Sequence, residues 1–203
     1  MIYIKRHNIC FITTSKNASI SIKKFFRDNV VQPDDVVNKI NRIIIAIENG
    51  VPKDAKFFGI IRNPYERFLS SYFYISRKYP ELGFTGTCAD FENQLKMSIY
   101  NCNGNGNLHK NGQSKMFDCK EDIEKEIWCF DFLKDHINSF INEYKIEIVF
   151  PLEHRNKTSL STKNLIDTYY NEETKNMVYE RYQRDFELYD EVKEKWSRIY
   201  NAQ

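Results

Sequence analysis

Two stretches of the chain show the same three patterns in the same order: an apolar run, a polar turn with a cation, and an amphipathic helix pattern. They cover residues 8–29 and 56–79. The apolar runs 8–14 and 56–61 predict buried strands, because short runs rich in β-branched and aromatic residues between turn signals are typical of them. Strands that alternate with helices indicate βαβ units. We therefore expect an α/β fold of three layers, with a mostly parallel central sheet flanked by helices.

Further patterns extend this arrangement along the chain. Additional strands are expected at residues 127–130 and 146–150. Helices are expected at residues 20–29, 34–49, 65–79, 90–100, 131–144 and from 171 onward, with a break near 185. The segment 101–113, rich in Asn and Gly, reads as a surface loop. A length of 203 residues suits a single domain over residues 1–203.

Composition excludes several classes of protein. A chain that is 41% hydrophobic, with 15 Phe and 13 Tyr, is too apolar for a disordered segment. A net charge of +2 argues against a nucleic-acid partner. The longest aliphatic run, residues 43–47, is far below the ~20 residues that span a bilayer, so no integral membrane segment is expected. Five cysteines without a C-x-x-C pair indicate free thiols and no metal site, although a bridge among Cys88, Cys102 and Cys119 is the alternative.

The first turn presents Lys16 ahead of the small residues Ala18, Ser19 and Ser21 at an expected helix N-terminus. Backbone N–H groups and the helix dipole favour an anion at such a position, and small side chains let it approach closely. The glycines of a Walker A loop are absent, and the lysine precedes the small residues. An ordinary capped helix is the alternative.

The second turn carries Arg62 at the end of the expected strand and Ser70 eight residues later on the following helix. A guanidinium fork and a hydroxyl are both suited to hold a phosphate. The alternative is that Arg62 pairs with a carboxylate such as Glu66. Because strands that lie side by side bring their carboxyl ends together, two such turns suit a nucleotide with two separate anionic groups.

These residues carry a family resemblance. FITTSKNASISI (11–22) resembles the 5′-phosphosulfate loop of sulfotransferases, and IIRNPYERFLSSY (60–72) resembles their 3′-phosphate-binding strand and helix. Weaker similarities follow at HKNGQ (109–113), PLEHRN (151–156) and YQRDF (182–186). The most similar group is the carbohydrate sulfotransferases of the heparan-sulfate and bacterial glycan type. The chain departs from the family at Ser15, where Pro is usual, and at Ala18, where Gly is frequent.

The resemblance implies a P-loop-like nucleotide-binding sulfotransferase fold. It also implies 3′-phosphoadenosine 5′-phosphosulfate (PAPS) as donor, 3′-phosphoadenosine 5′-phosphate (PAP) as product, a carbohydrate hydroxyl as acceptor and no metal. The implied donor-binding residues are Lys16, Asn17, Ala18, Ser19, Ile20, Ser21, Arg62 and Ser70. Lys16 would also neutralise the leaving phosphate oxygen, and His109 would act as the base. The implied acceptor residues are His109, Gln113, Lys115 and Arg155.

Other interpretations of the same residues stay open. Glu153 and Glu66 are alternative bases, whereas His7 and His136 are expected at the surface. Two other functions stay open. One is a nucleotide-dependent kinase, and the other is a sulfotransferase-like module that binds a glycan or nucleotide without turnover. Asn17 begins an N-glycosylation sequon, and a glycan there would block the phosphate loop, so the expected compartment is the cytoplasm.

Overall fold

The fold divides into two compact units. The computed structural model describes residues 1–38, 41–100, 112–119, 122–150 and 162–201. Unit 1 comprises Met1–Arg62, Gln113–Arg155 and Leu188–Gln203, and unit 2 comprises Asn63–Gly112 and Asn156–Glu187. The expectation of a single domain over residues 1–203 stays a prediction.

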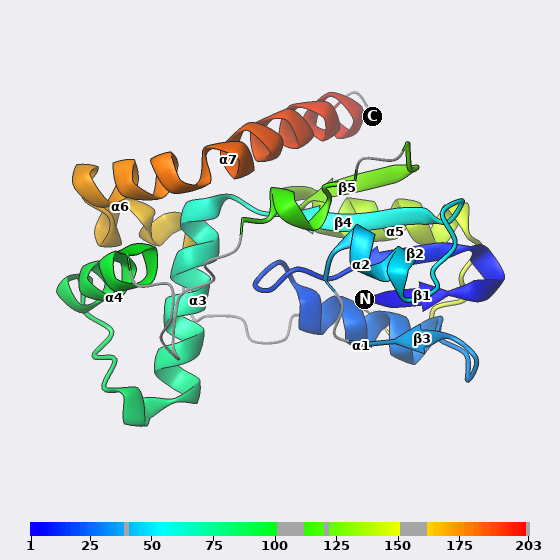
Figure 1. The fold of residues 1–203 in the computed structure, drawn as a ribbon, viewed down its shortest axis with the longest axis horizontal. Coiled ribbons are helices and arrows are strands. Elements are labelled where there is room, and N and C mark those ends of the chain that lie inside the picture. The colour runs from blue at the N-terminus through cyan, green and yellow to red at the C-terminus, as the bar shows by residue number, and fades with distance from the viewer. Residues whose placement is uncertain (39–40, 101–111, 120–121, 151–161, 202–203) are drawn as a thin grey trace. The chain divides into compact units, whose positions relative to one another are not determined.

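Unit 1 is built on a five-stranded sheet (Figure 1). The strands are β1 (Ile2–Ile4), β2 (Ile9–Ile12), β3 (Val36–Val37), β4 (Lys56–Ile61) and β5 (Lys125–Cys129). Their order is β3-β1-β2-β4-β5; β2, β4 and β5 are parallel, whereas β1 is antiparallel to both β2 and β3. The α/β class is therefore confirmed, but the expectation of a mostly parallel sheet is wrong, because the sheet is mixed.

Strand β1 is one of the elements that the sequence interpretation missed. A short 3₁₀ helix, η1 (Lys5–His7), and Asn8 at φ 52° reverse the chain, so that Ile4 pairs with Ile9 in a tight antiparallel hairpin. Asn tolerates this left-handed backbone better than most residues. Lys5 and Arg6, which interrupt the apolar start of the chain, thus lie in a turn that follows a fully buried strand.

The expected helix 34–49 is wrong over its first half. Val36 and Val37 form β3 at the edge of β1, and helix α2 covers only Ile43–Glu48. Two adjacent β-branched residues favour the extended backbone, and the open edge of β1 supplies their hydrogen-bond partners.

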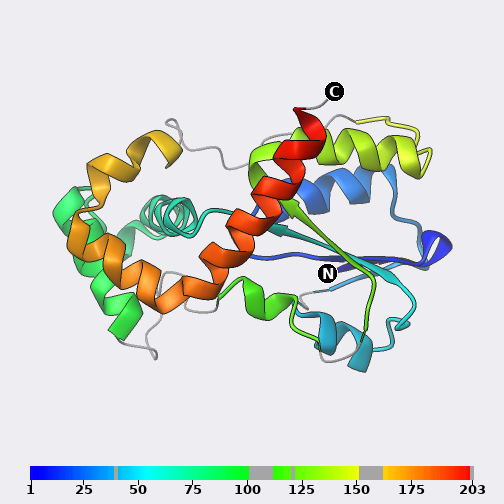
Figure 2. The same ribbon diagram turned by 90° about the horizontal axis from the view of Figure 1, so that it is seen from above.

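Helices cover both faces of the sheet, as expected (Figure 2). Helices α1 (Ser19–Asn29) and α5 (Leu133–Glu143) pack on one face, and α2 with the 3₁₀ helix η3 (Ser114–Met116) packs on the other. Helix α7 (Glu172–Tyr200) adds Tyr189 and Val192, which pack against Ile61 and Cys129 at the ends of β4 and β5. The carboxyl ends of the parallel strands are thus set in a buried, apolar framework.

Aromatic rings pack against one another in the core between the sheet and helices α1 and α5. Phe11 of β2 stacks on Phe58 of β4 with centroids 5.3 Å apart, and Trp128 of β5 meets Phe11 edge-on at 5.0 Å. Phe140 of α5 contacts all three rings. Such pairs add about 0.5–1.5 kcal/mol each beyond the burial of their area.

Unit 2 is helical. It contains α3 (Pro64–Lys78), η2 (Pro80–Leu82), α4 (Cys88–Tyr100), η5 (Thr162–Leu165), α6 (Ile166–Tyr169) and the first part of α7. Its core joins Phe68 and Tyr72 of α3 with Phe91 and Leu95 of α4 and Tyr182 of α7. Helix α7 has non-helical φ and ψ at Tyr182, so the expected break lies there and not at residue 185.

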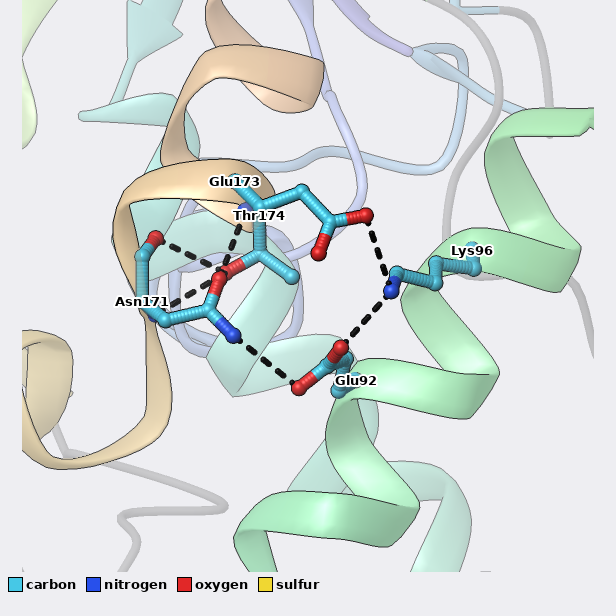
Figure 3. A network of polar contacts seen from close by, with 5 residues as sticks. All are labelled: Glu92, Lys96, Asn171, Glu173 and Thr174. Atoms are coloured by element: carbon cyan, nitrogen blue, oxygen red, sulfur yellow. Dashed lines mark hydrogen bonds and ion pairs between the residues drawn. The ribbon is translucent and has the colours of Figure 1, made fainter.

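A polar network joins α4 to the start of α7 (Figure 3). Asn171 caps α7, because its Oδ1 accepts the Thr174 N–H at 2.8 Å while Thr174 Oγ1 accepts the Asn171 N–H at 3.0 Å. Asn171 Nδ2 donates to Glu92 of α4 at 3.1 Å, and Lys96 bridges Glu92 and Glu173 at 2.7 and 3.0 Å. This reciprocal cap explains why the long helix begins where the sequence indicates.

Residues 146–150 form no strand, which corrects another expectation. The N–H groups of Val149 and Phe150 both donate to Asn29 Oδ1 at 2.9 Å, so a side chain of α1 takes the place of a neighbouring strand.

Over the described residues, no helix has the length and apolar character needed to cross a bilayer.

Candidate functional site

The candidate site lies in unit 1, at the carboxyl ends of β2 and β4. These two strands are parallel neighbours, with Ile12 of β2 opposite Gly59 of β4. The turn after β2 and the turn after β4 therefore leave the same edge of the sheet. This confirms the expectation that the two cation-bearing turns follow adjacent strands.

The first turn is compact and uses a left-handed backbone at two residues that are not glycine. Lys16 has φ 68°, and Ala18 has φ 56° and ψ 17°. The Asn17 N–H points back to the Thr14 carbonyl at 3.4 Å. Each left-handed residue with a Cβ costs about 1–2 kcal/mol, so other contacts must stabilise this turn.

The N-terminus of α1 has no side-chain cap. Its N-cap residue is Ala18, and its first turn, which is described throughout, holds no acidic residue. Ser19 is half-buried, Ile20 is 47% exposed and Ser21 is buried. Since the positive end of a helix dipole favours negative charge, this end of α1 is suited to an anion. Helix α3 differs, because Asn63 caps it by accepting from the N–H groups of Tyr65 and Glu66.

Buried side chains fasten the first turn to β4. Asn17 Nδ2 donates to the Ile60 carbonyl at 2.6 Å, and Thr14 Oγ1 donates to the same carbonyl at 3.1 Å. Both side chains are 1% exposed. Within the described part of the chain, Asn17 Oδ1 has no hydrogen-bond partner. The sequence interpretation used only the backbone of Asn17 and so missed this structural role of its amide.

The second turn is fastened to the first by Arg62. Its Nη1 donates to the Lys16 carbonyl at 3.2 Å, and its guanidinium carbon lies 4.2 Å from the centroid of the Phe130 ring. The side chain is 9% exposed. A guanidinium over an aromatic face is attracted by the ring quadrupole, so Phe130 helps to fix its direction. Phe130 follows β5, and no motif in the sequence pointed to it.

Gln113 links both turns. Its Oε1 accepts the Arg62 N–H at 3.0 Å and Asn17 Nδ2 at 2.5 Å, while its Nε2 donates to the Arg62 carbonyl at 2.8 Å. The side chain is fully buried. An acceptor-site role for Gln113 stays a prediction, and the structure places its amide against the two cation-bearing turns.

The other expected site residues are placed as follows. Ser70 is half-buried on α3 in unit 2, and Lys115 is exposed on η3 in unit 1. Glu66, an alternative base, is buried in unit 2 and accepts from Thr162 Oγ1 at 3.4 Å. The structure thus joins Lys16, Asn17, Arg62 and Gln113 within one network. His109, Glu153, His154 and Arg155 lie outside the described residues.

Of the other two histidines, His136 is buried, and the expectation that it lies at the surface is wrong. Its ring stacks on Trp128 at 5.2 Å, its Nε2 accepts the Cys129 N–H at 3.1 Å, and its Nδ1 lies 3.0 Å from the Tyr200 hydroxyl. Burial, with a smaller effect of Lys195, lowers the pKa of His136 to about 3. It is therefore neutral at physiological pH. His7 is half-buried, and burial together with Arg6 lowers its pKa.

Comparison with protein-family models, with curated proteins and with solved structures finds no match for this chain. The function must therefore be inferred from the site itself. Two turns that leave the same sheet edge, one at an uncapped helix N-terminus and one with a fixed guanidinium, form the kind of site that binds a ligand with anionic groups.

Proposed function

We propose that this protein transfers a sulfuryl group from PAPS to a hydroxyl of a carbohydrate, as a sulfotransferase. The observation that carries the proposal is the hydrogen-bond network that joins two cation-bearing turns on neighbouring parallel strands. Its members are Lys16, Asn17, Arg62 and Gln113. A donor with a 5′-phosphosulfate and a 3′-phosphate has anionic groups for both turns. The family resemblance of the same two segments supports this assignment.

The first turn holds the 5′-phosphate in this proposal. Backbone N–H groups of residues 17–21, with the hydroxyls of Ser19 and Ser21, bind its oxygens at the uncapped end of α1. The acceptor oxygen forms a bond to sulfur as the bond from sulfur to the bridging phosphate oxygen breaks. The electron pair of the broken bond stays on that oxygen, and Lys16 stabilises the charge that develops there.

The second turn holds the 3′-phosphate. Arg62 supplies a guanidinium fork in this proposal. The hydroxyl that the resemblance assigns to Ser70, which lies on α3 in unit 2, stays a prediction. The 3′-phosphate distinguishes PAPS from ATP and AMP, which carry no phosphate at this position. The turn is therefore the basis of donor selectivity.

The acceptor hydroxyl must lose a proton as its oxygen attacks sulfur. His109 takes this proton in the proposal, with Glu153 and Glu66 as the alternative bases. His136 is excluded from this role because its ring is enclosed and its pKa is lowered to about 3. Lys115 and Arg155 offer positive charge for an anionic glycan, and Gln113 is the remaining acceptor-site candidate.

Calorimetric titration with PAP, AMP and ATP in the absence of metal tests the donor site. We expect PAP to bind more tightly than AMP. Replacing Arg62 by Ala should weaken PAP binding by about 10- to 100-fold, since hydrogen bonds to charged groups contribute about 1.5–3 kcal/mol, and should change AMP binding little. Arg6→Ala is the matched control, because Arg6 is an exposed arginine of unit 1 that donates to the Val30 carbonyl.

Three results would contradict the proposal. Equal loss of PAP and AMP affinity in Arg62→Ala would remove the 3′-phosphate assignment. A preference for ATP with Mg²⁺ would favour a kinase. Selective PAP binding without transfer from PAPS to any glycan in an acceptor screen would favour a non-catalytic binding module.

A further inference from the structure

The amide of Gln113 meets the main chain of Arg62 in both directions. Its Oε1 accepts the Arg62 N–H at 3.0 Å, and its Nε2 donates to the Arg62 carbonyl at 2.8 Å. Arg62 is the first residue beyond β4, and the last registered pair of β4 with β5 is Ile61 with Cys129. A side chain therefore provides the donor and the acceptor that a neighbouring strand provides to the residues before Arg62.

The same amide also reaches the other turn. Gln113 Oε1 accepts from Asn17 Nδ2 at 2.5 Å, and that Nδ2 also donates to the Ile60 carbonyl at 2.6 Å. Asn17 is the residue between the two left-handed residues, Lys16 and Ala18. One buried side chain thus touches the turn that presents Lys16 and the residue that presents the guanidinium.

We propose that Gln113 is a positioning residue that fixes the separation of the two phosphate-binding turns, and so sets the selectivity for a nucleotide phosphorylated at both 5′ and 3′ positions. This inference rests on the proposed donor. Gln113 is fully buried, so it acts through Arg62 and Asn17 and not by touching the donor. A ligand with one phosphate needs only one turn, whereas PAP needs both turns at a fixed distance.

A substitution that keeps the volume but removes the amide isolates this role. Gln113→Met leaves the Arg62 N–H and carbonyl without their amide partners and releases Asn17 from its contact with residue 113. We expect PAP affinity to fall about tenfold, the equivalent of about 1.4 kcal/mol, and AMP affinity to fall less than about threefold. Gln113→Asn, whose amide is one methylene too short for these contacts, should give the same selective loss and serves if the Met variant does not fold.

The matched control is Asn29→Leu. Asn29 is another amide of unit 1 that binds main-chain groups in both directions, since its Nδ2 donates to the Phe150 carbonyl and its Oδ1 accepts the Phe150 N–H, each at 2.9 Å. This variant also loses a clamp on the backbone, but away from the two turns. Its PAP affinity should stay within about twofold of the unaltered protein, even if its free energy of unfolding falls as much as that of Gln113→Met.

The test is a double-mutant cycle for PAP binding, measured by calorimetry. If Gln113 acts through Arg62, then Arg62→Ala combined with Gln113→Met should bind PAP within about twofold of Arg62→Ala alone. Additive losses would overturn the inference. Unchanged PAP affinity with a raised acceptor KM would also overturn it, because Gln113 would then serve the acceptor. Failure of the unaltered protein to prefer PAP over AMP would overturn the proposed function itself, before any variant is compared.

Discussion

Acidification should destabilise this protein through one residue, His136. Its ring is buried between Trp128 and Trp196, and its Nε2 accepts the Cys129 N–H at 3.1 Å. Only the neutral ring can accept this hydrogen bond, so the other ring nitrogen carries the proton and faces the Tyr200 hydroxyl. Protonation would place a charge in an apolar site and remove the bond that holds the last residue of β5.

The size of the effect follows from the two pKa values of this side chain. Burial lowers the pKa of His136 from 6.5 to about 3 in the folded protein, whereas the unfolded chain keeps the ordinary value. The unfolded state therefore binds more protons between these values, and stability is lost as the pH falls through this window. The loss attributable to His136 is about 2 kcal/mol at pH 5 and about 3 kcal/mol at pH 4.

Urea denaturation at pH 7.5, 6, 5 and 4 measures this loss when the protein is compared with His136→Gln. Carboxylates titrate in both proteins, so their contributions cancel in the difference between the two pH profiles. We expect the two free energies of unfolding to converge by about 2 kcal/mol between pH 7.5 and pH 5. Parallel profiles would refute the reasoning, because they would mean that the pKa of His136 is the same in the folded and unfolded states.

Two substitutions test the backbone and packing around the candidate site by the same denaturation assay. Ala18→Gly should stabilise the protein by about 0.5–1 kcal/mol, because residue 18 has a left-handed backbone. The control, Ala46→Gly within α2, should destabilise the protein. A change in the free energy of unfolding with the same sign in both variants would contradict the turn geometry. Gly59→Ala should cost about 2–3 kcal/mol, since a Cβ there would lie 2.0 Å from Phe117 Cε1. Adding Phe117→Leu should recover part of this loss. If stability does not recover, the clash with the Phe117 ring is not the cause of the loss.

The parts of the fold that the sequence predicted well are those whose signals are local. The run 56–61 matches β4, and α3 begins at Pro64, one residue before the expected start at 65. The interpretation failed where pairing partners decide the structure. Val36 and Val37 form a strand because β1 offers an edge, whereas residues 146–150 form none, and Asn29 binds the N–H groups of Val149 and Phe150. Neither partner is visible in a pattern of neighbouring residues.

The candidate site divides in the same way. Lys16 and Arg62 could be found from the sequence, because a cation after an apolar run and before a helix is a local pattern. Phe130 and the amide of Gln113 reach the site from distant parts of the chain, at 68 and 51 positions from Arg62. Their residue types are common in cores and loops, so only the three-dimensional contacts reveal what they do.

Besides the Arg62 guanidinium, neutral groups contribute to fastening the two turns, and neutral groups are compatible with the proposed anionic ligand. The contacts come from the amides of Asn17 and Gln113, the hydroxyl of Thr14 and the ring of Phe130. Amides satisfy buried main-chain groups as donors and as acceptors without adding negative charge. A carboxylate in the place of Gln113 would accept the same N–H groups, but it would offset the guanidinium of Arg62 and repel a phosphate at short range. In the proposed donor site, uncharged side chains thus fix the separation of the two turns without placing a negative charge beside a bound phosphate.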